Sequence, residues 1–246
     1  MASAVFDAHP ETIRFPLMEK PLVGCLLAFM AGAMDAWTLG NAQTFATVQS
    51  GNVVSSGYWL VQGDWPRFCF ALFSVIAFGL GSLVCGILMT IMLRRKRVYT
   101  PQVLFAQAAI LAVLGVLVLR GEANPHYVAF AVSFVAGAQG NAFHKSHGML
   151  YGNVAVTFVV QMAFNFLIQS VFSRKGINGE PNLMWSGLFF LVLLGFAMGG
   201  AIGFLIDSLT DGVALFLPAA IALILLVVAL AERGRPIDPT PGGLIG

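Results

Sequence analysis

The stretch Ala31–Asn52, AGAMDAWTLGNAQTFATVQSGN, decides how this chain folds, because it carries polar side chains into apolar surroundings. Asp35 interrupts an apolar run, and hydroxyl and amide side chains follow where a simple loop would be expected to turn. These are Thr44, Thr47, Gln49, Ser50 and Asn52, with Gly51 as a hinge among them. Such groups are costly within a membrane, so those that occur there are by default candidates for a functional site.

The composition of the chain is that of a membrane protein. Of its 246 residues, 58% are hydrophobic and 10% are charged, and the mean hydropathy is +0.85. Soluble domains carry about 25% charged residues, so a water-soluble fold is excluded and the lipid bilayer is an expected partner. The net charge of +2 is too small to indicate nucleic acid as a partner.

Six segments have the length of about 20 mainly apolar residues that a membrane-spanning helix needs. They lie at about 21–40, 66–93, 99–119, 124–142, 182–206 and 212–231. Two further segments, about 43–62 and 151–172, are long enough to cross, but amides and hydroxyls interrupt them. With six spans and a cytosolic N-terminus, every Lys and Arg except Arg67 and Arg120 faces the cytosol. This bias falls when the second or both of the ambiguous segments cross, so the positive-inside rule favours six spans with both termini cytosolic.

An internal repeat divides the membrane domain, 20–232, into two units, 20–120 and 124–232. The sequence Phe29-Met-Ala-Gly-Ala33 recurs as Phe134-Val-Ala-Gly-Ala138, and the glycine-rich spacing of 77–85 recurs at 195–203. Each unit has three spans, and an odd number of spans turns the second unit upside down. Inverted repeats with broken helices are typical of transporters. Residues 1–19 are expected to form a cytosolic lead and 233–246 a flexible cytosolic tail.

Small residues recur at four-residue spacing in the first and second spans of each unit, as in Gly195-x-x-x-Gly199-x-x-x-Gly203. Such ridges allow helices to approach closely in lipid. We interpret them as packing seams within the chain, and a homodimer through these ridges is the alternative.

The polar residues suggest a path for a solute. Asp35 is a candidate coupling or gating carboxylate, or alternatively a hydrated acid near the outer interface that bonds Thr38. Ser50-Gly51-Asn52 is suited to a break in a re-entrant helix, because glycine permits the break and the polar side chains satisfy freed backbone groups. The alternative is a continuous helix with a polar face that packs in the bundle. In the second ambiguous segment, polar residues at four-residue steps predict either a path or an interhelical hydrogen-bond ladder. The expected pathway residues are Asp35, Thr47, Gln49, Ser50, Gly51, Asn52, Asn141, Gln161 and Asn165.

Signals of other chemistry are weak. His144 and His147 form a His-Lys-Ser-His sequence, but no nearby Cys, Asp or Glu completes a metal site. No pairing of a nucleophile with a base is visible. We therefore expect no metal, no cofactor and no enzymatic activity.

The chain resembles the YoaK-like family of bacterial multi-pass membrane proteins, which is known mainly as a domain of unknown function. The resemblance covers about 20–232 and rests on three short motifs and a glycine-rich helix. The motifs are Gly32-Ala-Met-Asp35-Ala36, Ala46-Thr-Val-Gln-Ser50-Gly51-Asn52 and Gly137-Ala-Gln139-Gly-Asn141. It implies a protein of the bacterial inner membrane with signatures at Asp35 and at residues 50–52. The second unit has Gln161-Met-Ala-Phe-Asn165 where the family often repeats a hydroxyl-Gly-Asn turn.

The sequence thus predicts an all-α polytopic membrane protein. It has six transmembrane helices in two inverted three-helix repeats, each with an extra re-entrant or broken segment. The expected function is transport of a small polar solute or ion, as a transporter or a channel. The alternative is a non-transporting membrane scaffold or sensor, in which the polar groups are satisfied inside the bundle.

Overall fold

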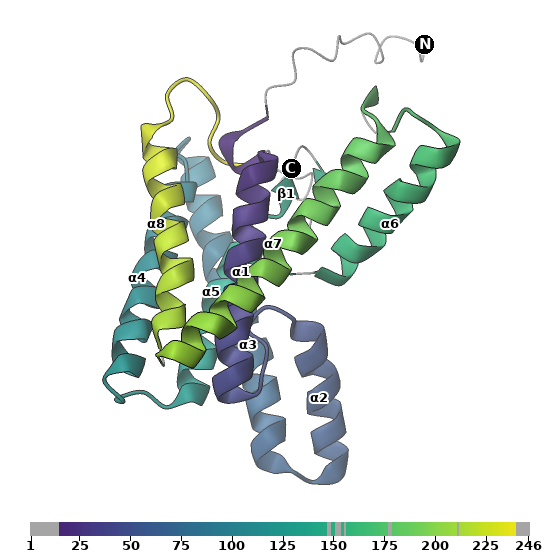
Figure 1. Cartoon of the computed structure of the whole chain (residues 1–246). Helices are drawn as coiled ribbons and strands as arrows, with labels where there is room; N and C mark the ends of the chain where they lie inside the picture. The colour runs from purple at the N-terminus through teal and green to yellow at the C-terminus, as the bar shows by residue number, and fades with distance from the viewer. Residues whose placement is uncertain are drawn as a thin grey trace.

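The structure, a computed structural model, describes residues 15–146, 149–150, 154, 156–176, 179–210 and 212–239. Eight α-helices make up most of this part (Figure 1). The remaining elements are two 3-10 turns, η2 and η4, and one hairpin of two strands with two residues each. The helices are α1 Pro21–Ala42, α2 Gln49–Gln62, α3 Trp65–Arg94, α4 Thr100–Leu119, α5 Pro125–Ala142, α6 Val156–Phe172, α7 Asn182–Leu209 and α8 Phe216–Ala231. The short elements are η2 Leu17–Glu19, η4 Val213–Leu215, β1 Lys145–Ser146 and β2 Met149–Leu150.

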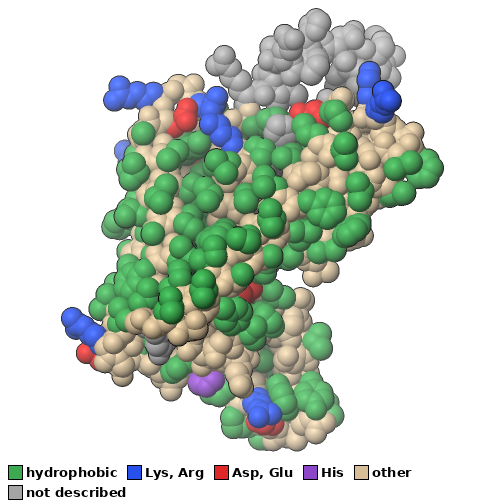
Figure 2. Space-filling model, viewed as in Figure 1, with side chains coloured by type: hydrophobic (Ala, Val, Ile, Leu, Met, Phe, Trp, Pro, Cys, Tyr) green, Lys and Arg blue, Asp and Glu red, His purple; other side chains and the backbone are tan. Residues whose placement is uncertain are grey.

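Five helices are long and apolar enough to cross a membrane. They are Pro21–Ala42, Trp65–Arg94, Thr100–Leu119, Asn182–Leu209 and Val213–Ala231. The sixth expected span is also a helix, α5, but Gln139 and Asn141 make its last turns polar. Hydrophobic side chains cover the surface between two ends where Lys and Arg gather (Figure 2). These are the features of a helical membrane protein.

The two halves of the chain exchange packing partners. In the first half α1 packs mainly on α7 of the second half, and α5 of the second half packs mainly on α3 of the first. Helices α4 and α8 pack on each other beside them (Figure 1). The core therefore forms between the halves rather than within each one.

Glycines bring α1 and α7 into backbone contact. A Cβ atom added at Gly32 would collide with the carbonyl oxygen of Phe196, and one added at Gly199 would collide with that of Phe29. The contact is reciprocal, since each glycine faces the residue three positions before the other. The small-residue ridges on these helices are therefore seams within the chain.

The same arrangement joins α3 and α5. A Cβ atom at Gly81 would collide with the carbonyl oxygen of Phe134, and one at Gly137 would collide with that of Phe78. These residues belong to the motifs that suggested the repeat. The glycine spacing that recurs in the sequence thus makes the same backbone contact in both helix pairs, α1 with α7 and α3 with α5.

The two ambiguous segments form helices that are shorter than the five candidate spans. At 1.5 Å per residue, α2 is about 21 Å long and α6 about 26 Å. Helix α2 lies against α3 and α6 against α7, and the two hairpins project at opposite ends of the bundle (Figure 1).

The break before α2 lies earlier than the sequence suggested. Ser50, Gly51 and Asn52 belong to the first turn of α2, which begins at Gln49. Helix α1 ends at Ala42, and the next residue, Gln43, has a left-handed φ of 52° that turns the chain into the connection 43–48. The expectation of a break at 50–52 is therefore wrong. The Asn52 side chain instead bonds the backbone of this connection, which stabilises the break there.

The tail contributes an anchor that the sequence did not indicate. The Asp238 carboxylate accepts hydrogen bonds from the backbone N–H groups of Tyr99 and Thr100, each at 3.0 Å, and so caps α4. The backbone N–H of Leu17 donates to the carbonyl oxygen of Pro236 at 2.9 Å. Burial, and then the nearby Asp238 carboxylate, raise the pKa of the Tyr99 hydroxyl. Both ends of the described chain thus meet where α4 begins.

Candidate functional site

Asp35 joins the last turns of α1 to the connection 43–48. Its side chain is buried, and Thr47 satisfies both of its carboxylate oxygens. The Thr47 N–H donates to Oδ1 at 2.8 Å, and the Thr47 hydroxyl donates to Oδ2 at 2.5 Å. In the part of the chain that the structure describes, no Lys, Arg or His forms an ion pair with Asp35. The charge is therefore held by hydrogen bonds alone.

Asn52 is the centre of a second set of hydrogen bonds on the same connection. Its Oδ1 accepts from the Thr44 hydroxyl at 3.0 Å, and its Nδ2 donates to the carbonyl oxygen of Phe45 at 2.7 Å. The same nitrogen lies 3.0 Å from Gln49 Oε1 and 3.0 Å from Ser74 Oγ. Because Asn52 is buried, this set fixes the connection against α2 and α3.

Two serines extend these bonds into the bundle. The Ser74 hydroxyl on α3 lies 2.9 Å from the Ser133 hydroxyl on α5, and both side chains are fully buried. Sequence reasoning missed both, because a single serine in an apolar helix looks like a small packing residue. We call Asp35, Thr44, Thr47, Gln49, Asn52, Ser74 and Ser133 the polar network.

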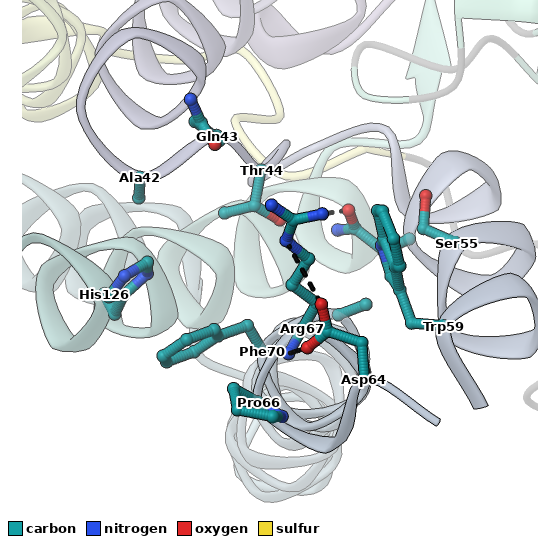
Figure 3. Close-up of a pocket in the computed structure, with 12 residues that line it drawn as sticks. Ala42, Gln43, Thr44, Ser55, Trp59, Asp64, Pro66, Arg67, Phe70 and His126 are labelled. Carbon is teal, nitrogen blue, oxygen red and sulfur yellow. Dashed lines mark hydrogen bonds and ion pairs between the residues drawn. The ribbon is translucent and has the colours of Figure 1, made fainter. Parts of the chain in front are cut away.

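A cavity of about 530 Å³ lies beside the polar network (Figure 3). It is bounded by the end of α1, by α2, and by the first turns of α3 and α5. We call it the first cavity. Thr44 and Asn52 belong both to its wall and to the polar network. The other lining residues are Ala42, Gln43, Ser55, Trp59, Asp64, Pro66, Arg67, Phe70, Ala71 and His126.

Charged and aromatic side chains meet in this cavity. The Arg67 guanidinium carbon lies 4.5 Å from the centre of the Trp59 ring, and Arg67 Nε lies 3.5 Å from Asp64 Oδ2. The His126 ring stacks on Phe70 with 3.8 Å between ring centres. The first cavity therefore combines one cation, one acid, amides and rings.

Comparison with known families now places the chain. Residues 23–229 match the family described as "protein of unknown function (DUF1275)". The chain belongs to this family. The match agrees with the resemblance to YoaK-like membrane proteins that the motifs indicated. No curated protein and no solved structure matches the DUF1275 chain.

The structure brings together four of the residues that the sequence proposed for this DUF1275 protein. Asp35, Thr47, Gln49 and Asn52 all belong to the polar network. Ser50 is exposed on the first turn of α2, and the neighbouring Gly51 is half-buried. Neither belongs to the network.

The three residues proposed from the second unit lie elsewhere. Asn141 is at the end of α5, where its Nδ2 donates to the carbonyl oxygen of Ser82 at 3.0 Å. Gln161 is exposed on α6, and Asn165 lines a different cavity. Asn153 and His147 lie outside the described residues. The polar residues at four-residue steps wind around α6, so Gln161 lies away from the cavity that Asn165 and Gln169 both line.

That different cavity, about 550 Å³, lies between α6 and the start of α7, and we call it the second cavity. Asn182 is buried there and donates from Nδ2 to the carbonyl oxygen of Ser173 at 3.0 Å. Its buried Oδ1 has no hydrogen-bond partner in the described part of the DUF1275 chain. The other lining residues are Met162, Asn165, Phe166, Gln169, Phe172, Lys175 and Gly176.

Metal-ligating side chains do not gather in this part of the protein. Among the described residues of the DUF1275 chain, no three His, Cys, Asp or Glu side chains lie close enough to hold a metal ion. The chemistry on offer at both cavities is hydrogen bonding and charge.

Proposed function

We propose that the protein is a transporter or channel for a small polar solute or ion in the bacterial inner membrane, rather than an enzyme. The observation that carries this proposal is the contact between the polar network and the first cavity. A solute in the first cavity therefore contacts Asn52 and Thr44, which hold the connection 43–48. Asp35 holds the same connection through Thr47.

The proposal includes six spans, with α5 as the sixth. At 1.5 Å per residue its 18 residues reach about 27 Å. Helix α5 packs on α3 as α1 packs on α7, which supports the same role for both. The polar last turns of α5 are enclosed by other helices, since Gln139 is fully buried and donates to the carbonyl oxygen of Leu27 at 2.9 Å.

The proposal also includes two inverted repeats. Helices α1 to α4 correspond to α5 to α8, with α2 and α6 as the extra short segments. The exchange of partners and the reciprocal glycine contacts support this correspondence. The charge bias places both termini in the cytosol. In this orientation the first cavity opens to the outside and the second to the cytosol, which suits alternating access.

Uptake into liposomes that contain the purified protein tests the proposal. The solutes are radiolabelled amino acids, sugars, carboxylic acids and inorganic ions, offered in separate pools. Asp35→Asn removes the buried charge, Asn52→Ala removes the centre of the hydrogen bonds, and Ser50→Ala is the matched control on the exposed side of α2. We expect uptake of at least one pool, lost in the first two variants and kept in the third. Unchanged uptake in both Asp35→Asn and Asn52→Ala would exclude the site.

A membrane scaffold or sensor is the second candidate. It is favoured by the completeness of the polar network, because both oxygens of Asp35 and both ends of the Asn52 amide have partners. Under this function the first cavity admits no solute. Uptake of no pool, together with an unreactive cavity wall, would support it.

A further inference from the structure

The Arg67 side chain lines the first cavity and is 60% exposed to solvent there (Figure 3). The acid beside it, Asp64, contacts Nε at 3.5 Å. In the described part of the chain the two terminal nitrogens have no ion-pair or hydrogen-bond partner. These two nitrogens are the ones with which arginine makes paired hydrogen bonds to an oxyanion.

The surroundings hold the guanidinium in place. The Trp59 ring packs against it at 4.5 Å, and Asp64 is fixed by the start of α3, where Oδ1 accepts from the Arg67 N–H at 3.2 Å. An arginine that is already oriented loses less conformational freedom when it binds a ligand. Additional hydrogen-bonding groups in the lining of the first cavity are Gln43, Thr44, Ser55 and His126.

Charge in the second cavity agrees with the same ligand. Lys175 lines it together with the amides of Asn165, Gln169 and Asn182, and no Asp or Glu is among its described lining residues. Each cavity is thus lined by one cation and by amide groups. Among the described lining residues of both cavities the one acid is Asp64, whose carboxylate contacts Nε of Arg67.

We propose that the first cavity binds a small oxyanion, a carboxylate or a phosphate, between the terminal nitrogens of Arg67 and the hydroxyl and amide groups opposite. This inference rests on the proposed function and names the class of its solute. Trp59 is the positioning residue for Arg67, and the Asp64 carboxylate competes with a bound anion for the charge of Arg67.

Isothermal titration with sodium acetate and with sodium phosphate tests binding, using the full-length protein in detergent at constant ionic strength with chloride as the balancing anion. We expect saturable binding of at least one oxyanion. Arg67→Gln should weaken it at least about tenfold, because a charge-assisted pair is lost. Arg120→Gln, which removes the other arginine outside the cytosolic clusters, should leave it unchanged. Equal binding by the Arg67→Gln variant and the unmodified protein would overturn the proposal.

Asp64→Asn gives an independent result of opposite sign. Asparagine caps a helix as well as aspartate does, so α3 keeps its start while the acid disappears. An oxyanion should bind more tightly to this variant, by about threefold or more, because the competing charge is gone. Weaker binding would show that the cavity takes a cation or a zwitterion, and would overturn the proposal even if Arg67→Gln failed to fold.

Free phosphate and a phospholipid headgroup both carry an oxyanion. A third experiment, which compares phosphate binding in detergent and in nanodiscs, distinguishes the two as ligands. If phospholipid occupies the site, phosphate should bind in detergent and fail to bind in phosphatidylcholine nanodiscs. If the natural ligand is free, binding should be the same in both. Either result supports an oxyanion site. Binding with no uptake of any pool would overturn the transport function and leave the oxyanion site standing.

Discussion

At the scale of single residues, the buried charge of Asp35 is the feature that the sequence predicted best. A lone acid within an apolar run is costly unless something satisfies it, and that cost marked the position. The structure supplies the partner, Thr47, twelve residues later. Spacing alone did not identify that partner, because the connection 43–48 has no periodicity from which a contact follows.

Thr47→Val tests this pair. The substitution keeps the shape of the side chain and removes the hydroxyl that donates to Asp35 Oδ2, so one oxygen of a buried carboxylate loses its partner. We expect a loss of about 1–3 kcal/mol in the free energy of unfolding, measured by denaturation in detergent. The exposed neighbour change Ser50→Ala should stay within about 0.5 kcal/mol. A Thr47→Val variant as stable as Ser50→Ala would show that the pair does not hold the connection.

At the scale of the elements, glycine spacing predicted helix contacts that the structure confirms. Small residues at four-residue steps allow close approach only if they face a partner backbone, and Gly199 faces the carbonyl of Phe29. The beginning of α2 was predicted less well. Gly51 permits a break but does not require one, and the Asn52 side chain, within α2, donates to the carbonyl oxygen of Phe45 in the connection before the helix.

Two glycines on α7 make a matched test of these contacts. Gly199→Ala places a methyl group against the backbone of α1, so we expect a loss of about 1–3 kcal/mol in stability from overpacking. Gly187→Ala is on the same helix with open space around it, and should be neutral or stabilising by up to about 1 kcal/mol. Thermal unfolding of both variants in detergent compares them directly. Equal stability would mean that α1 and α7 are not in backbone contact.

The anchor on α4 gives a second test at this scale. Asp238→Ala removes the acceptor for the first N–H groups of α4. Because losing a cap costs about 0.5–2 kcal/mol, we expect a fall of that size in unfolding free energy. Asp238→Asn retains an oxygen acceptor and should recover part of it. No difference between the alanine variant and the unmodified protein would place the tail elsewhere in solution.

At the scale of the whole molecule, sequence predicted the helical membrane class from composition and most of the helices from apolar length. It did not predict how the candidate site divides. The amide side chain of Asn52 also occurs in Asn141 and Asn165, and a similar one in Gln161, but the residue type does not indicate where each lies in the fold. Helix α6 packs on α7 at the opposite end of the bundle from α2 (Figure 1). The residues of the single path that the sequence indicated therefore divide between two cavities of similar size, one at each hairpin, and the end of α5.

The central claim is that these cavities open on opposite faces of the membrane, and cysteine labelling tests it most directly. Ser55 lines the first cavity and Gln169 the second. Each is changed to cysteine in a chain whose Cys25, Cys69 and Cys85 are alanine, and sealed vesicles of known orientation are treated with a membrane-impermeant maleimide. We expect Ser55→Cys to react only from the outside and Gln169→Cys only from the cytosolic side. Reaction of both from the same side, or of neither from any side, would contradict it.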